Sequence, residues 1–158
     1  MLEDSFWYQV RSAEKQEWEA VIAFVWNAFL QSEGKQCTAL GRDLFWQFIT
    51  NSDLKDSFAK GEYPVLLALK DDRIIGAAAV RYHNHLSLLF VDEAYRYRGI
   101  GKELLHIVMQ YVRDMGERYI SLQAVSGAVP FYQRYGFRGI RPEEEFAGIR
   151  VTYMEKYF

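Results

Sequence analysis

The sequence predicts a mixed α/β (α+β) fold, in which about four helices flank one mixed β-sheet. Three observations support this class. A long amphipathic helical pattern occupies the first third of the chain, and three strand-like runs follow one another in the middle. A glycine-containing turn then joins the last of these runs to a second amphipathic helix. The 158 residues, half of them hydrophobic, fit a single domain, residues 1–158, with a substantial core.

The first part of the chain alternates one expected strand with two expected helices. Residues 6–10 form the strand, and Ser12 is the expected N-cap of the first helix. Apolar residues at helical spacing predict that helix: Trp18, Val21, Ile22, Val25, Trp26 and Phe29. A polar run at 31–37 ends it. A second apolar set predicts the next helix: Leu40, Leu44, Phe45, Phe48 and Ile49. Residues 51–62 form a polar connection without an assigned element.

Three strands are expected in the middle of the chain, at 64–69, 73–82 and 85–91. Asp71-Asp72 forms the first hairpin turn, and Asn84 marks the second. A helix then runs from about 99 to 115, with one apolar face: Ile100, Leu104, Ile107, Val108, Tyr111, Val112 and Met115.

The last part of the chain completes the sheet. Gly116 ends the central helix, and a strand follows at 119–124. A short helix spans 126–135, and the closing strands are 137–140 and 149–157. The expected order is therefore β-α-α-β-β-β-α-β-α-β-β, with one strand–helix–strand crossover around the glycine turn.

Composition and charge exclude several kinds of protein. A net charge of −2 provides no overall field that would attract nucleic acid. The single Cys37 excludes an internal disulfide framework and a cysteine-cluster metal site. No run approaches the ~20 apolar residues of a membrane span, and residues 1–4 are acidic, without a signal-peptide pattern. We expect a cytoplasmic protein with no metal, no nucleic-acid partner and no membrane partner.

The glycine turn, residues 96–101, is the most informative segment. Gly99 and Gly101 allow a ligand to approach the backbone closely. The free N–H groups at the start of a helix can bind a pyrophosphate. Three nearby cations strengthen the attraction for this anion: Arg96, Arg98 and Lys102. The alternative is a tight turn that packs a helix on a strand. The three-glycine Rossmann fingerprint and its supporting acidic residue are missing.

Two motifs carry a family resemblance. Leu89-Phe90-Val91-Asp92 followed by Arg96-Tyr97-Arg98-Gly99-Ile100-Gly101 resembles the acetyl-CoA pyrophosphate loop of the GCN5-related N-acetyltransferases (GNAT family). The stretch 128–137 resembles their Ala-x-x-Phe-Tyr-x-x-x-Gly-Phe helix, and the element order is similar to the GNAT fold throughout. The resemblance implies acetyl-CoA as cosubstrate. It implies binding by Leu89, Phe90, Val91, Arg96, Tyr97, Arg98, Gly99, Ile100, Gly101 and Lys102.

Tyr132, in the second motif, is the first candidate catalytic residue. The resemblance implies that its hydroxyl points at the cofactor thioether, where a phenol of pKa ~10 can protonate or hydrogen-bond to the departing thiolate. The alternative is a helix tyrosine in an aromatic core. The chain also departs from the family pattern. Val125 stands where many relatives have Asn, and Gln123 stands where many have a Glu that can act as the base.

His85 is the candidate base. Regular strand alternation places it on one face with Ser87, Leu89 and Val91. The arylalkylamine-acetylating relatives have a histidine near this position that helps to deprotonate the amine, and a neutral imidazole suits the task. The alternative is a turn histidine beside Asn84. The acidic run 143–145 either attracts a cationic amine or is a solvated loop.

The sequence is compatible with two functions. The first is an N-acetyltransferase that transfers acetyl from acetyl-CoA to a primary amine, on a small molecule or a protein, by direct attack in a ternary complex. The second is a non-catalytic acyl-CoA-binding sensor or interaction module. Large aromatic side chains near the end of the chain, at Tyr153, Tyr157 and Phe158, make a homodimer possible.

Overall fold

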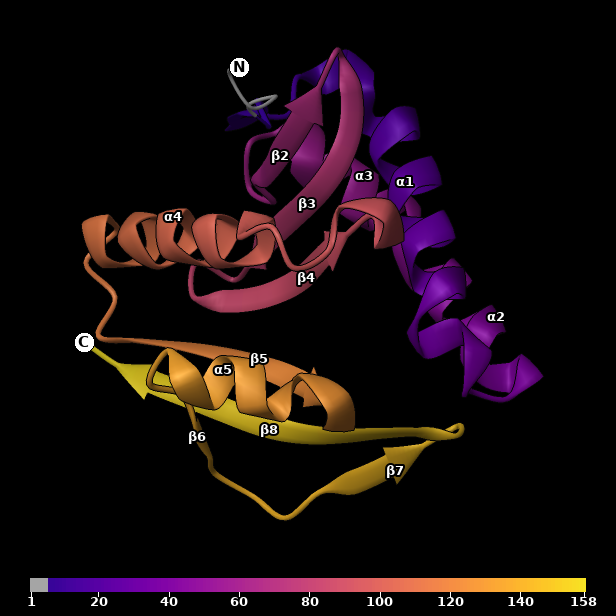
Figure 1. Cartoon of the computed structure of the whole chain (residues 1–158), viewed down its shortest axis with the longest axis vertical. Helices are drawn as coiled ribbons and strands as arrows, with labels where there is room; N and C mark the ends of the chain where they lie inside the picture. Colours follow the sequence, from indigo (N-terminus) through magenta and orange to yellow (C-terminus); the bar gives the residue numbers. More distant parts are fainter. Residues whose placement is uncertain (1–5) are drawn as a thin grey trace, which may run out of the picture.

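The computed structural model describes residues 6–158 and is built around one mixed β-sheet (Figure 1). Its strand order is β1-β2-β3-β4-β5-β8-β6, with β7 paired to β8. The strands are β1 (Gln9–Ser12), β2 (Val65–Lys70), β3 (Arg73–Arg81), β4 (His85–Val91), β5 (Tyr119–Val125), β6 (Arg138–Gly139), β7 (Glu144–Phe146) and β8 (Ile149–Tyr157). Neighbouring strands are antiparallel except β4 and β5, which are parallel. The expected mixed sheet is confirmed.

Helices cover both faces of the sheet. They are α1 (Trp18–Gln31), α2 (Ala39–Ile49), α3 (Ser52–Ala59), α4 (Ile100–Asp114) and α5 (Val129–Arg134). In Figure 1, α4 and α5 lie over one side of the sheet and α1 to α3 over the other. Short 3₁₀ turns, Lys15–Glu17, Glu33–Lys35, Glu93–Tyr95 and Ser126–Ala128, lead into or out of these elements.

The core has two apolar layers, one on each face of the sheet. The apolar stripe of α4 supplies the first layer, in which Leu104, Leu105 and Val112 have no exposed surface. The second layer is built on α1 and α3, with Val21 and Val25 equally inaccessible. Burial of such a side chain stabilises the fold by about 1.5–3 kcal/mol. These stripes therefore fix which side of the sheet each helix covers.

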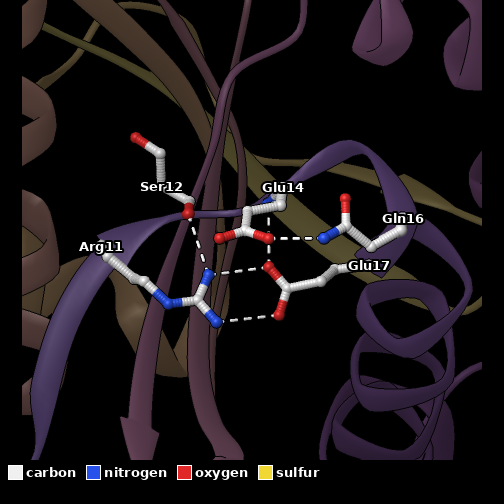
Figure 2. A network of polar contacts seen from close by, with 5 residues as sticks. All are labelled: Arg11, Ser12, Glu14, Gln16 and Glu17. Atoms are coloured by element: carbon white, nitrogen blue, oxygen red, sulfur yellow. Dashed lines mark hydrogen bonds and ion pairs between the residues drawn. The ribbon is translucent and has the colours of Figure 1, made fainter.

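The N-terminal strand differs from its expected position. β1 begins at Gln9 rather than at residue 6, and Ser12 is its last residue instead of a helix cap. The junction with α1 is held by Arg11, whose two terminal nitrogens donate to Glu17 at 2.7 and 2.9 Å (Figure 2). Glu17 also accepts the backbone N–H of Glu14 at 2.8 Å. These bonds lower the pKa of Glu17 to about 2.

Two elements were not expected from the sequence. The polar connection 51–62 contains α3, which Asn51 caps by accepting the N–H of Asp53 at 2.7 Å. Leu54 and Phe58 fall on one side of this short helix and are buried. Strand β7 pairs with the start of β8, and the strand expected at 137–140 is reduced to β6.

The parallel pair β4–β5 is short, and this shortness positions the site. The strands are paired only at His85 with Ser121 and at Leu86 with Leu122. Beyond Leu86 they diverge, and Figure 1 shows β5 and β8 running apart from β4. The sheet therefore opens beyond these two pairs.

A β-bulge in β4 corrects one expectation. Val80 pairs with Leu86 and Ala79 pairs with Leu88, so Ser87 is an extra residue on β4. Leu86 packs in the α4 layer and Leu88 in the α1 layer, although regular alternation would place residues two positions apart on the same face. The expectation that His85 shares a face with Leu89 and Val91 is wrong, because the bulge shifts the alternation between them.

Candidate active site

The glycine turn forms one wall of a surface groove. Gly99 is the N-cap of α4 and adopts a left-handed conformation, with φ of 85°. The groove has a volume of about 560 Å³ and lies between this turn and α5. All the residues expected to bind the cofactor line it except Arg98, whose guanidinium lies 4.7 Å from the ring centre of Phe6.

The groove suits an anion. The first N–H groups of α4 have no partner within the helix, and the helix dipole places partial positive charge there. Arg96 and Lys102 line the groove, and Arg134 joins them from the last turn of α5. A Cβ built on Gly101 would lie 3.7 Å from both Phe131 and Val91, so the protein itself leaves room for a side chain there. A pyrophosphate fits this donor set.

Tyr132 connects the groove to the interior of the sheet. Its ring packs edge-on against Phe131 and Phe137, with centroid distances of 5.1 and 5.6 Å, and the residue is 8% exposed. It lines both the groove and a second cavity of about 280 Å³ between β4 and β5. Burial raises the pKa of Tyr132, and the charge of Glu33 raises it further. The phenol therefore stays protonated throughout the physiological range.

The cavity between β4 and β5 lies between two other hollows. On the groove side the two hollows share Leu89, Phe90 and Tyr132. On the other side the cavity shares Ser87 and Gln123 with a third hollow of about 560 Å³. Because successive hollows share lining residues, the three lie in a row, here called the path, from the start of α4 to the opposite face of the sheet.

His85 lies in the third hollow, together with Phe45 and Phe48 of α2. Its Nδ1 is 2.8 Å from the hydroxyl oxygen of Ser121, so one side of the ring is fixed. Burial lowers the pKa of His85, and the nearby charge of Arg81 lowers it further. The imidazole is therefore neutral at pH 7, as a base must be.

Glu33 is a site residue that sequence reasoning missed. It lies in the 3₁₀ turn after α1 and lines both the groove and the cavity beside Tyr132. Its carboxylate accepts a hydrogen bond from the Ser32 hydroxyl. The only signal in the sequence was a carboxylate in the polar break 31–37, which does not reveal that this break crosses the opening of the sheet.

The acidic run 143–145 belongs to a different surface. Glu143 accepts hydrogen bonds from Ser126 and from Arg150, the latter at 3.1 Å, and Arg150 also lies 3.7 Å from Glu145. These partners lower the pKa of Glu143. The run does not line the hollow that contains His85. The run therefore lies at the start of the exposed β7–β8 hairpin, where Arg150 pairs with Glu143 and Glu145.

Within residues 6–158, no three His, Cys, Asp or Glu side chains are grouped so that they could hold a metal ion. No helix in the described part of the chain has the length and apolarity needed to cross a membrane.

Sequence comparisons identify related proteins. The profile of the Acetyltransferase (GNAT) domain family matches residues 30–158. A curated relative, the uncharacterized N-acetyltransferase YafP of Escherichia coli (strain K12), is 29% identical over 98 residues. The match covers 62% of this chain and spans 60% of that relative's length.

Solved structures share the fold. The PaiA N-acetyltransferase of Thermoplasma acidophilum, in complex with coenzyme A, superposes with a TM-score of 0.79 and 17% identity, over 97% of this chain and all of that one. A GCN5-related N-acetyltransferase of Rhodopseudomonas palustris also gives a TM-score of 0.79, with 16% identity over 95% of each chain. At such identities the likeness establishes the fold.

Proposed function

The chain belongs to the GNAT acetyltransferase family, and on this basis we propose that it transfers the acetyl group of acetyl-CoA to a primary amine. Attack is direct, in a ternary complex. The observation that carries the proposal is the path of three hollows, because it links an anion-binding groove to a buried phenol and then to a neutral imidazole. The PaiA relative, which is bound to coenzyme A, supports the same cosubstrate.

The groove binds the cosubstrate. The N-terminus of α4, Arg96 and Lys102 hold its pyrophosphate, and Arg134 adds charge from α5. The backbone of Leu89 to Val91 lines the same groove next to the opening of the sheet, where its N–H groups donate to the acetyl oxygen as that atom gains charge. Acetyl-CoA supplies the activated thioester.

Tyr132 stabilises the leaving sulfur. A thiol has a pKa of about 8.5, and an ordinary tyrosine about 10. Since burial raises the pKa of Tyr132 further, complete proton transfer to a thiolate is uphill. The phenol therefore acts mainly as a hydrogen-bond donor to the sulfur.

His85 prepares the amine. A primary ammonium must lose a proton before it can attack, and a neutral imidazole accepts it. The hydrogen bond between Nδ1 and Ser121 fixes the ring, so Nε2 is the nitrogen that takes the proton from the acceptor amine. Glu33 is the second candidate base, because its carboxylate lies on the same path, nearer to Tyr132.

The acceptor enters from the face of the sheet that α2 covers, opposite to the cosubstrate. The hollow on that face is lined by aromatic side chains and by polar groups of β4, β5 and β8. We also propose a cytoplasmic location and a possible homodimer. The low net charge gives no reason to expect a nucleic-acid partner.

Mass spectrometry of reactions with acetyl-CoA and a panel of amines tests the proposal. We expect a product heavier than one of the amines by one acetyl group, together with free CoA. Tyr132→Phe should form this product about 100-fold more slowly, and Tyr157→Phe, a change on an exposed tyrosine, should form it at the wild-type rate. Binding of CoA without transfer to any amine would contradict the proposal and favour a non-catalytic acyl-CoA sensor.

A further inference from the structure

A row of cross-strand partners crosses the acceptor face of the sheet. Arg81 of β3 pairs with His85 of β4, His85 pairs with Ser121 of β5, and Ser121 pairs with Glu155 of β8. Directly paired residues project from the same face, with Cβ atoms about 5 Å apart. The row therefore carries a cation at one end, a carboxylate at the other, and the candidate base between them.

Arg81 has a charge that no acid neutralises within the described range, residues 6–158. Its guanidinium lies 5.3 Å from the ring centre of Phe48 and 4.8 Å from that of Tyr82. It lines the hollow that contains His85 and also an adjoining cavity, where Asp53 and Glu62 lie outside ion-pair distance. The cation is available to a ligand.

The hairpin turn after Arg81 borders this hollow through Tyr82 and Asn84. Tyr82 and His83 both adopt positive φ, 57° and 70°, which is unusual for a bulky side chain. The backbone N–H of Ser121 donates to the carbonyl of Asn84 at 2.9 Å and holds the turn against β5. This conformation keeps the Tyr82 ring beside Arg81.

We infer that the acceptor is an amine that also carries a carboxylate, of the aromatic amino acid class, and that Arg81 binds the carboxylate. This inference rests on the proposed acetyl transfer. A guanidinium binds a carboxylate through two parallel hydrogen bonds. In an α-amino acid, one carbon separates the amine from the carboxylate. Arg81 and His85 are direct cross-strand partners and line the same hollow, so the two groups of one small acceptor can reach both side chains.

The other walls of the hollow fit the same class of acceptor. Phe45, Phe48, Tyr82 and Tyr153 line it and would enclose an aromatic side chain. Glu155, beyond Ser121, is held by the hydroxyls of Tyr153 and Tyr157 at 2.6 and 3.3 Å. Its negative charge favours an acceptor whose ammonium points toward β8 and whose carboxylate points toward Arg81.

Two matched amines test the anchor. Phenylalanine and phenethylamine share the ring and the primary amine, and only phenylalanine has the carboxylate. We expect kcat/KM of the wild type to be higher for phenylalanine. Arg81→Met should lower kcat/KM for phenylalanine by about 10–100-fold, the scale of a charged hydrogen-bonded pair, and change that for phenethylamine less than about 3-fold. Arg81→Lys should restore part of the loss.

Arg113→Met is the matched control, because it removes a guanidinium that also lies on an aromatic ring, Phe158, but on α4 and away from the path. This variant should leave kcat/KM for both amines unchanged. Equal effects of Arg81→Met on the two amines, or a wild-type preference for phenethylamine, would overturn the anchor and leave acetyl transfer standing. Calorimetric titration of phenylalanine into the CoA-bound protein judges the anchor separately if no amine is acetylated: Arg81-dependent binding supports it, and absence of binding contradicts it.

Discussion

His85 Nδ1 lies 2.8 Å from the hydroxyl oxygen of Ser121, at the point where the parallel strands β4 and β5 begin to separate. Two features of the fold produce this contact. The short pairing of β4 with β5 brings the two residues together, and the bulge at Ser87 turns His85 toward α2. The candidate base is thereby fixed on the face of the sheet opposite to the cofactor groove.

This placement predicts a specific pH dependence. Because burial and Arg81 lower the pKa of His85 below its usual 6.5, activity should fall with acid only below pH 6.5. His85→Ala should reduce turnover near neutral pH by about 100-fold. The variant should partly recover at high pH, where free amine becomes abundant. The measurement is the pH–rate profile of both proteins. A wild-type profile in the variant would assign the base elsewhere, and Glu33→Gln would then be the next variant.

Tyr132→Phe should separate binding from chemistry. The substitution removes one hydroxyl from a packed ring, so CoA should bind with unchanged affinity. Turnover should fall by about 100-fold, because the departing sulfur loses its donor. Calorimetry with CoA and steady-state kinetics measure the two effects. Full turnover in this variant would remove Tyr132 from the mechanism, whereas loss of CoA binding would indicate a purely structural role.

Gly101 tests the cofactor groove without disturbing the fold. Its Cβ would meet Phe131 and Val91 only at an ordinary 3.7 Å, so Gly101→Val should fold and should lose CoA binding, because the new methyl groups occupy the ligand's space. Gly99→Val should lose it too, but there φ of 85° adds backbone strain. Gly61→Ala, at φ of 79° in open space, controls for such strain. Unchanged CoA affinity in Gly101→Val would contradict the groove assignment.

Much of the fold could be predicted from the sequence, because strong local patterns coincide with burial. Of the apolar face expected for α4, Ile100, Leu104, Val108 and Val112 are buried. Ile107 and Met115 are exposed instead, and Leu105 and Met109 are buried in addition. The family of the chain could be predicted from two motifs in the expected order, residues 96–101 and 128–137. In the first motif, glycine is needed because few other residues adopt the backbone conformation. Gly99, with its left-handed φ, is such a case.

The remaining features depend on tertiary contacts that no local pattern encodes. A bulge inserts one residue into β4 without a glycine or proline to mark it, so regular alternation gave His85 the wrong face. Helix α3 is short and mostly polar, and only two of its side chains are buried. Glu33 and Arg134 line the candidate site because elements distant in the sequence meet there. Arg98 does not line it, and its guanidinium lies over the ring of Phe6.

The ion pair at the start of α1 predicts a loss of stability in acid. Glu17 has an ordinary pKa of 4.5 when unfolded and about 2 when folded. Its contribution is therefore complete above pH 4.5 and is lost as the pH falls toward 2. Arg11→Met should lower Tm at pH 7 by roughly 1–3 °C, the scale of a surface ion pair. The difference from wild type should shrink near pH 3.

Lys55→Met is the control for this pair. Lys55 and Glu19 also form an ion pair, but their side chains are 58% and 79% exposed, so its loss should change Tm less at either pH. A Tm difference between Arg11→Met and wild type that is the same at pH 7 and pH 3 would contradict the assignment to Glu17.

The last strand predicts self-association. Tyr157 and Phe158 are 66% and 41% exposed. On the neighbouring strand β5, the ring of Tyr119 stacks on that of Tyr157, with a centroid distance of 5.3 Å. An exposed aromatic surface of this kind, made by Tyr119, Tyr157 and Phe158, is often covered by a partner. Light scattering should give about twice the chain mass of 18.6 kDa, and Tyr157→Asp should lower it. A monomer at high concentration would reject the homodimer.

A crystal structure of the protein with bound CoA tests the central claim most directly. The account predicts the pyrophosphate at the backbone of Gly99 to Gly101 and the sulfur within hydrogen-bonding distance of the Tyr132 hydroxyl. The hollow around His85 should remain open to the acceptor on the other face of the sheet. A cosubstrate that enters from the Phe48 side, or a sulfur remote from Tyr132, would contradict it.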